Sequence, residues 1–229
     1  MSARTVNWTA LRDAEPSPEG LRERKKRQMR QQLSDTATEM FIERGFDAVR
    51  VAEIAEACGV SEKTVFNYFP TKESLVLDLG EATLGALDEL GNPEVSPVTA
   101  AVRILGQQLE AITSWLSAQE NAAEAIDRFR LFGALVQQTP SLRAHQRDMT
   151  DQLVTAAAQV LAKRFGVDSD NPEPQIAAIA LLGLWQVQFQ ALRKHLDAKR
   201  TPKEIAKAVT TDVQRAATTI DNGLTTLSK

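Results

Sequence analysis

Apolar residues recur every three or four positions along most of the chain, which is the spacing of amphipathic α-helices. In the first third, this pattern predicts four helices, each bounded by a Gly, Ser, Thr or Pro that can begin or end a helix. Their expected ranges are Leu21 to Arg44, Val51 to Cys58, a helix that follows Ser61 and stops before Pro70, and a longer helix from Thr71 to about Leu90. Residues 1–20 contain two prolines and no periodicity, so we interpret them as a mobile tail.

Beyond a linker at Gly91–Pro97, the chain predicts five longer helices. Their expected ranges are 98–118, 121–138, 141–165, 174–196 and 202–227. Aromatic residues make up only 5% of the chain, so few residues that favour strands remain to build a sheet. We therefore predict an all-α fold of about nine helices, with a three-helix helix-turn-helix head at 21–79 and a larger C-terminal helical domain at 80–229.

Cysteine and histidine are too scarce for several kinds of site. Cys58 is the single cysteine and the chain has two histidines, which excludes an internal disulfide and a Cys/His zinc site. No stretch approaches the length of a bilayer span, and the first 20 residues lack an apolar signal core. We expect a soluble, cytoplasmic protein with no cofactor, no metal and no membrane partner.

The predicted second and third helices lie in a sequence order that is typical of a DNA-binding motif. One helix ends at Gly59 and the next begins two residues later, as in a helix-turn-helix. In that motif the first helix braces the second, which presents its outward side chains to the DNA major groove. Helix spacing alone does not decide whether these two helices form a DNA-binding motif, because many helical bundles contain tight turns.

A basic run leads into this region. Residues 21–33 hold six Lys or Arg residues against the single acid Glu23, although the net charge of the chain is −3. The basic residues are Arg22, Arg24, Lys25, Lys26, Arg27 and Arg30. On composition alone the run is a solvated helix face, whereas beside a DNA-binding motif it favours a phosphate-binding arm.

The residues around the motif carry a family resemblance. The matching positions are Gly45-Phe46-Asp47-Ala48, Val51, Ile54-Ala55, Ala57 to Ser61, Thr64-Val65-Phe66, Tyr68-Phe69 and Lys72 to Leu75. From Leu33 to Leu79 the chain resembles the DNA-binding domain of the TetR family of bacterial repressors. The resemblance implies an all-α homodimer, whose head binds a double-stranded DNA operator and whose domain at 80–229 mediates dimerisation and binds a small-molecule inducer.

The resemblance also implies which residues contact DNA. The candidates are Arg50, Lys63, Thr64, Asn67, Tyr68 and Lys72, with Arg24, Lys25 and Arg27 in the basic run. Lys63 and Thr64 suit base edges or phosphate, and Asn67 suits an adenine edge. Tyr68 matches a position that commonly touches phosphate. Lys72 begins the predicted fourth helix, where free backbone N–H groups also favour a phosphate.

Three positions differ from the family pattern or raise a question. Arg50 stands where the family usually has Thr, so it cannot cap the second helix in that way, but its guanidinium can reach a phosphate. Phe66 stands where Tyr is frequent, which removes a hydroxyl contact and leaves a pure core role open. Glu62 is unfavourable near phosphate unless it accepts from a cytosine amine.

Large side chains on the central helices are candidates to line an apolar inducer cavity. They are Trp115, Phe129, Phe132, Met149, Trp185 and Phe189. Each of these side chains also fits an ordinary core, so the sequence does not decide which of them line a cavity. Possible polar groups in such a cavity are Gln186, Gln188, Arg128, Arg130 and His145.

The last two predicted helices favour packing on more than one side. The helix at 174–196 is apolar nearly all round. The last helix repeats Ile205, Val209, Val213, Ala216, Ile220, Leu224 and Leu227 at the spacing of a helix seam. Two such helices from each subunit would form an intermolecular four-helix bundle, which is the family's dimer mode, and an ordinary intrachain core is the alternative.

Together these features predict a ligand-responsive, DNA-binding transcriptional regulator, in the first place a homodimeric repressor that a small-molecule inducer releases from a palindromic operator. The alternative is a helical ligand-binding or scaffolding dimer without specific DNA binding. The residues do not distinguish an activator from a repressor. An enzyme is disfavoured, because no nucleophile, base and electrostatic stabiliser fall into a recognisable pattern.

Overall fold

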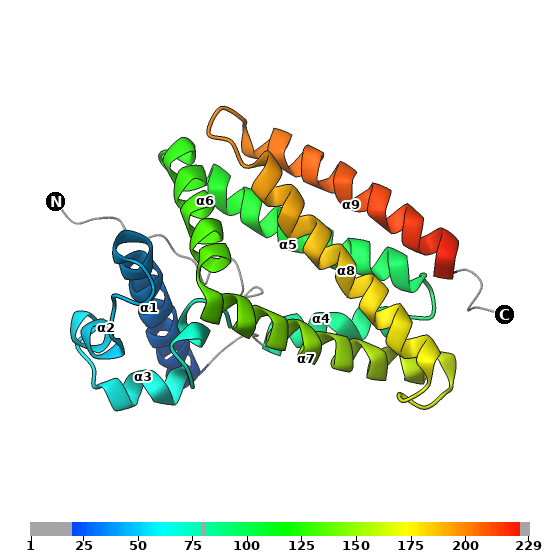
Figure 1. The fold of residues 1–229 in the computed structure, drawn as a ribbon, viewed down its shortest axis with the longest axis horizontal. Helices are drawn as coiled ribbons and strands as arrows, with labels where there is room; N and C mark the ends of the chain where they lie inside the picture. The colour runs from blue at the N-terminus through cyan, green and yellow to red at the C-terminus, as the bar shows by residue number, and fades with distance from the viewer. Residues whose placement is uncertain (1–19, 79–80, 225–229) are drawn as a thin grey trace. The chain divides into compact units, whose positions relative to one another are not determined.

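The computed structural model describes residues 20–78 and 81–224, and within them the chain is all-helical, with nine α-helices (Figure 1). The first elements are α1 (Leu21–Arg44), α2 (Val51–Ala57), α3 (Glu62–Tyr68), the 3-10 turn η2 (Glu73–Leu75), α4 (Glu81–Ala86) and the 3-10 turn η3 (Leu87–Gly91). They are followed by α5 (Pro97–Ser117), α6 (Ala122–Gln138), α7 (Pro140–Phe165), α8 (Pro172–His195) and α9 (Pro202–Leu224). The all-α prediction is confirmed. The predicted tail at 1–19, Leu79 and the predicted helix end at 225–227 lie outside the described residues.

The glycines that the sequence predicts as helix ends explain where the first helices stop. Gly45 and Gly59 follow α1 and α2 with φ of +88° and +68°, a region that L side chains rarely adopt. After α2, the amide of Gly59 donates to the carbonyl of Glu56 (3.0 Å) and the amide of Val60 donates to that of Ala55 (2.9 Å). These two bonds form a Schellman motif, which satisfies carbonyls that the helix end would leave free.

The continuous fourth helix predicted for 71–90 is wrong. In its place the chain forms η2, α4 and η3. Ser34 donates its hydroxyl to the carbonyl of Leu75 (2.7 Å), which in a continuous helix would accept from the amide four residues on. The hydroxyls of Thr71 and Ser74 each accept from the other residue's amide (3.1 Å), which closes a single turn. Contacts with α1 therefore override the helical spacing of this segment.

The chain divides into two compact units. The head unit consists of the described residues up to Ala82 together with Arg128–Arg147, and the helical unit consists of Thr83–Asp127 and the described residues from Asp148 onward. The predicted domain limits, 21–79 and 80–229, stay a prediction, and they leave 128–147 outside the head. This stretch groups with the head unit because Val136 and Leu142 are buried in its core.

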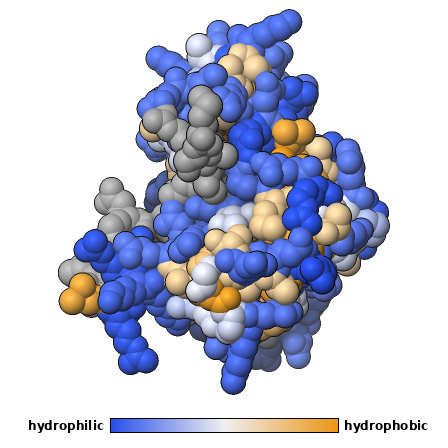
Figure 2. All heavy atoms as spheres, turned by 90° about the vertical axis from the view of Figure 1, so that its left-hand side faces the viewer, coloured by the Kyte–Doolittle hydropathy of each residue, from blue (hydrophilic) through white to orange (hydrophobic). Residues whose placement is uncertain are grey.

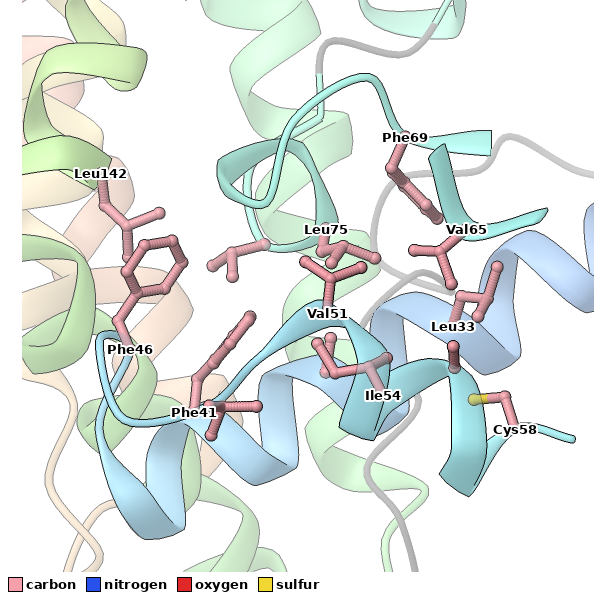
Figure 3. Packing of buried hydrophobic residues seen from close by; sticks show 14 of the residues in the cluster. Leu33, Phe41, Phe46, Val51, Ile54, Cys58, Val65, Phe69, Leu75 and Leu142 are labelled. Carbon is pink, nitrogen blue, oxygen red and sulfur yellow. The ribbon is translucent and has the colours of Figure 1, made fainter. Parts of the chain in front are cut away.

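The core of the head unit lies between α1, α2 and α3 (Figure 3). Its largest fully buried side chains include Leu33 and Phe41 of α1, Ile54 of α2, and Phe69 at the end of α3. The rings of Phe41 and Phe46 meet with centroids 4.8 Å apart. Truncating such a side chain to Ala in a well-packed core costs about 2–5 kcal/mol of stability. This core fixes the face of α3 that points inward.

In the helical unit, α8 and α9 run side by side and both pack against α5 (Figure 1). Ile205, Val209 and Val213 of α9 are buried within this single chain. These three residues therefore pack within one chain, whereas the four-helix bundle between two subunits stays a prediction. They are covered because α9 lies against two helices of its own chain.

The expectation that no stretch approaches the length of a bilayer span is also corrected. By length and composition, α8 is long and apolar enough to cross a membrane. Leu181, Leu182, Leu184 and other residues of α8 are buried among the helices of its own unit. A core helix of this kind passes the same test, so α8 is weak evidence for a membrane segment.

Candidate nucleic-acid interface

The short helix α3 has a buried face and an exposed face. Val65 and Phe69 are buried in the head core, one helical turn apart. On the opposite side Glu62, Lys63, Phe66 and Asn67 are exposed. Ser61 begins the helix, since its hydroxyl accepts from the amide of Thr64 (3.1 Å). The helix thus presents charged, amide and aromatic groups to solvent from a rigidly seated backbone.

Arg30 of α1 holds the end of α3 in place. Its Nη1 donates to the carbonyl oxygen of Tyr68 (2.6 Å), and its guanidinium carbon lies 4.4 Å from the centre of the Phe69 ring. Its Nη2 pairs with Asp78. Sequence reasoning counted Arg30 in the basic run and missed this role. Its spacing of three residues from the buried Leu33 was the one available sign that Arg30 faces the core rather than solvent.

Arg50 precedes α2 and extends into solvent. Its side chain is 81% exposed and makes no capping bond, although its Nε lies 3.5 Å from Oε2 of Glu53 in an exposed ion pair. Glu53 takes that role, since its carboxylate accepts from the backbone amide of Arg50 (2.8 Å) and from Nη2 of Arg44 (2.7 Å). These bonds, first the amide of Arg50 and then Arg44, lower the pKa of Glu53 to about 2. Arg50 keeps a guanidinium at the start of α2 that can reach an anion.

Lys72 is engaged inside the head unit. Its Nζ donates to the carbonyl of Phe46 (2.6 Å) and lies 4.4 Å and 5.3 Å from the ring centres of Phe46 and Phe41. Burial lowers the pKa of this ammonium. Lys72 precedes a three-residue 3-10 turn rather than the predicted long helix, so the helix N-terminus expected beside it is absent there. Its predicted phosphate contact stays a prediction that this geometry weakens.

The other predicted DNA-binding residues differ in exposure. Lys63, Asn67, Arg24 and Lys25 are exposed, whereas Thr64, Tyr68 and Arg27 are half-buried. The hydroxyl of Thr64 is also bonded to that of Ser61 (2.8 Å). Seen from the side on which α1, α2 and α3 lie in Figure 1, the surface is mostly hydrophilic, with smaller apolar patches (Figure 2).

Phe66 does not belong to the core. Its side chain is 44% exposed, whereas the adjacent Val65 is fully buried. The pure core role that the sequence left open is therefore excluded. Counting turns from the buried pair Val65 and Phe69 would have identified Phe66 as outward-facing, since it lies one turn after Glu62.

The six candidates for an inducer cavity fall in different units. Phe129 and Phe132 belong to the head unit, where their rings lie 6.1 Å apart and Phe132 packs against the head core. The other four belong to the helical unit and are half-buried there: Trp115, Met149, Trp185 and Phe189. The indole Nε1 of Trp185 is buried without a hydrogen-bond partner.

Two of the polar candidates already have partners in the head unit. Arg128 of α6 forms an ion pair with Glu39 of α1. The ring Nε2 of His145 is hydrogen-bonded to the carbonyl of Leu77 (3.0 Å). These contacts attach α6 and α7 residues to the head.

The helical unit has two hollows at its surface. One of about 500 Å³ lies along α8 and α9 and is lined by Val187, Gln190, Ala191, Lys194, Asp212, Arg215, Ala216 and Thr219. Another of about 290 Å³ is lined by Val154, Thr155, Ala158, Gln159, Ser169, Asp170, Gln175 and Ile179. None of the six predicted cavity residues lines either hollow.

Comparison with known proteins covers both units. The sequence model of bacterial regulatory proteins of the tetR family matches residues 33–79, and that of the MftR C-terminal domain matches 110–217. The HTH-type transcriptional regulator TcmR of Streptomyces glaucescens is 31% identical over 165 residues, which are 68% of this chain and 69% of TcmR. MftR of Mycobacterium tuberculosis is 27% identical over 152 residues, 66% of this chain and 73% of MftR. The crystal structure of NalD, the secondary repressor of the MexAB-OprM efflux pump in Pseudomonas aeruginosa, matches over 83% of this chain and 97% of NalD, with a TM-score of 0.48 and 22% identity.

An exposed helix that follows a Gly-terminated partner helix, within described residues that form only helices and turns, is the arrangement of the helix-turn-helix class of DNA-binding proteins. The extent and identity of the match to TcmR then show that the chain belongs to the TetR family of bacterial regulatory proteins. The prediction of a ligand-responsive, DNA-binding regulator is confirmed at this level. The family is one of transcriptional regulators and not of enzymes.

Proposed function

We propose that this protein is a cytoplasmic homodimeric repressor whose two α3 helices enter successive major grooves of a palindromic operator, and which a small-molecule inducer releases. The observation that carries the proposal is the outward face of α3, where Lys63 and Asn67 are exposed while Val65 and Phe69 anchor the helix. A helix of this kind reads base edges only when its backbone is held rigidly against a supporting core.

The individual contacts follow from side-chain chemistry. Asn67 suits a bidentate contact to an adenine edge, and Lys63 suits guanine or phosphate. Arg50, with its exposed guanidinium, suits a backbone phosphate. The exposed Arg24 and Lys25 of α1 supply sequence-independent attraction to the phosphates.

Dimerisation through α8 is supported by an apolar and charged pattern on that helix. Ile176 and Ile179 are 53% and 55% exposed and lie on one side, three residues apart. Glu173 occupies the first turn of α8, and Arg193 and Lys194 occupy its last turn. Antiparallel pairing of two copies about a twofold axis would cover the isoleucines and bring each acidic end beside the other copy's basic end.

We assign the inducer to the helical unit, around Trp185. The buried indole N–H of this residue has no partner, and an unsatisfied buried donor is costly unless a ligand or water accepts from it. Gln188, three residues on, is buried on the same helix. An inducer with an apolar body and a hydrogen-bond acceptor would suit these groups, together with the half-buried Trp115, Met149 and Phe189. Phe129 and Phe132 remain candidates on the head-unit part of α6.

Release requires a ligand that binds more tightly to the arrangement that does not fit DNA. A coupling free energy of about 1–3 kcal/mol is typical of such control and changes operator affinity by roughly 5- to 150-fold. Reciprocity then requires that operator DNA weaken inducer binding by the same factor.

The direct test is selection of bound sequences from a random duplex pool, followed by gel-shift titration of the winning duplex. The wild-type chain is expected to enrich a palindromic sequence. The Lys63→Ala/Asn67→Ala variant should lose that preference, whereas Lys207→Ala/Gln214→Ala, which alters exposed residues of α9, should keep it. A wild-type chain that enriches no sequence would contradict the proposal and favour a ligand-binding or scaffolding dimer.

A further inference from the structure

Phe66 lies near the middle of the face of α3 that we propose to enter the groove. In an α-helix it stands roughly 40° around the axis from Glu62 and roughly 60° from Lys63, so it lies between these two exposed residues. Within the part of the chain that the structure describes, Phe66 is the one aromatic residue with an exposed side chain. Its place on the proposed reading face puts this exposed ring where it would meet DNA in the complex.

The chemistry of the major groove restricts which DNA groups the ring of Phe66 can contact. A phenyl ring has no group that donates or accepts a hydrogen bond, so it cannot satisfy a phosphate or a polar base edge. The apolar group that B-DNA exposes in the major groove is the C5-methyl of thymine. We propose that Phe66 determines specificity by packing its ring on a thymine methyl in each half-site, an inference that rests on the proposed operator binding.

Neither a core role nor a protein-docking surface accounts as well for the exposed ring. A core role is excluded, because the inward positions of α3 are already filled by Val65 and Phe69. A protein-docking surface usually presents a contiguous apolar patch, whereas Phe66 is flanked on α3 by Glu62, Lys63 and Asn67. The ring is therefore an isolated apolar contact within a polar reading face, and it should accept 5-methylcytosine as readily as thymine at its position.

The test combines a protein change with the deletion of a single methyl group from DNA. In the operator selected by the wild-type chain, each thymine is replaced in turn by uracil, symmetrically in both half-sites. At one position the wild-type affinity should fall about four-fold for each half-site, the effect expected when one methyl group loses its burial. With Phe66→Ala that position should become indifferent to uracil, while losses at other thymines persist.

The controls separate this contact from a general weakening. Phe66→Leu should keep part of the discrimination, and Glu62→Ala, on the same face, should keep all of it. Thermal melting should show that Phe66→Ala remains folded, since the side chain is exposed. If wild type and Phe66→Ala lose the same affinity with uracil at every thymine, the inference is wrong although operator binding stands. If the wild-type chain selects no operator, both the inference and the proposed function fail.

Discussion

The guanidinium of Arg30 donates a hydrogen bond to the carbonyl oxygen of Tyr68, with 2.6 Å between Nη1 and oxygen. This bond joins α1, which carries the basic run, to the last residue of α3. The same guanidinium lies over the ring of Phe69 and pairs with Asp78. One residue of the basic run is thus an internal support of the reading helix, while Arg22, Arg24, Lys25 and Lys26 of the same run are exposed.

Replacing Arg30 should therefore destabilise the fold before it alters phosphate binding. Arg30→Met removes a charged hydrogen bond and a contact between a cation and an aromatic ring, and we expect a loss of about 1–3 kcal/mol in the free energy of unfolding. Chemical denaturation measures this loss. The matched variant Arg22→Met changes an exposed residue, and its effect should stay below about 0.5 kcal/mol. Equal stability of the two variants would contradict the supporting role.

The predicted arm residues Arg24, Lys25 and Arg27 should act on every DNA sequence alike. The Arg24→Gln/Lys25→Gln/Arg27→Gln variant is expected to bind all duplexes more weakly. The slope of log affinity against log salt concentration should become shallower by about 0.9 for each phosphate that the protein no longer neutralises. Titrations at several salt concentrations measure this slope. Neutralising Lys163, Lys203 and Lys207, which are exposed residues of the helical unit, makes the same charge change and should leave the slope as it was. An unaltered slope in the first variant would remove the arm from the interface.

Arg50 and Lys72 should differ as phosphate ligands, although both are cations of the head unit. Arg50 extends into solvent, whereas the ammonium of Lys72 is bonded to the carbonyl of Phe46. Arg50→Met should therefore lower the salt dependence by about one phosphate contact per head, and Lys72→Met by clearly less. The opposite order would mean that Lys72 leaves its internal partners when DNA binds.

Glu53 should make stability depend on pH in the acid range. Its pKa is lowered to about 2, so its contribution is fully present above pH 4.5 and is lost as the pH falls toward 2. Glu53→Gln should melt at a lower temperature than wild type at pH 7, and the gap should narrow between pH 4.5 and 3. A gap that does not depend on pH would refute the assignment.

The exposed isoleucines of α8 should control assembly. Ile179→Glu places a charge twice in a twofold interface and should give a monomer at micromolar concentration, as measured by light scattering after gel filtration. Its operator affinity should fall as well, because two linked heads bind more tightly than one. Leu84→Glu also charges an exposed apolar position and should remain dimeric. A dimeric Ile179→Glu variant would exclude this face as the interface.

Some of the head could be predicted because its determinants are local. Gly45 and Gly59 end helices through their own backbone freedom, and Ser61 caps α3 through an amide three residues away. The segment 71–90 was mispredicted because the carbonyl of Leu75 bonds to Ser34, which is 41 residues away and which no local pattern reports. The same limit applies to Lys72, whose partner Phe46 is 26 residues distant.

The sequence by itself determined the helical class, most helix boundaries and the inward positions of Val65 and Phe69, since these depend on periodicity and short-range hydrogen bonds. Only the tertiary structure decided that Arg30 supports α3, that Lys72 is held by Phe46, that Phe66 is exposed, and that Ile205, Val209 and Val213 belong to one chain's core. The physical reason is that burial and pairing between distant residues depend on which helices meet. For a side chain that suits both solvent and core, the neighbouring residues in sequence do not predict whether it is buried.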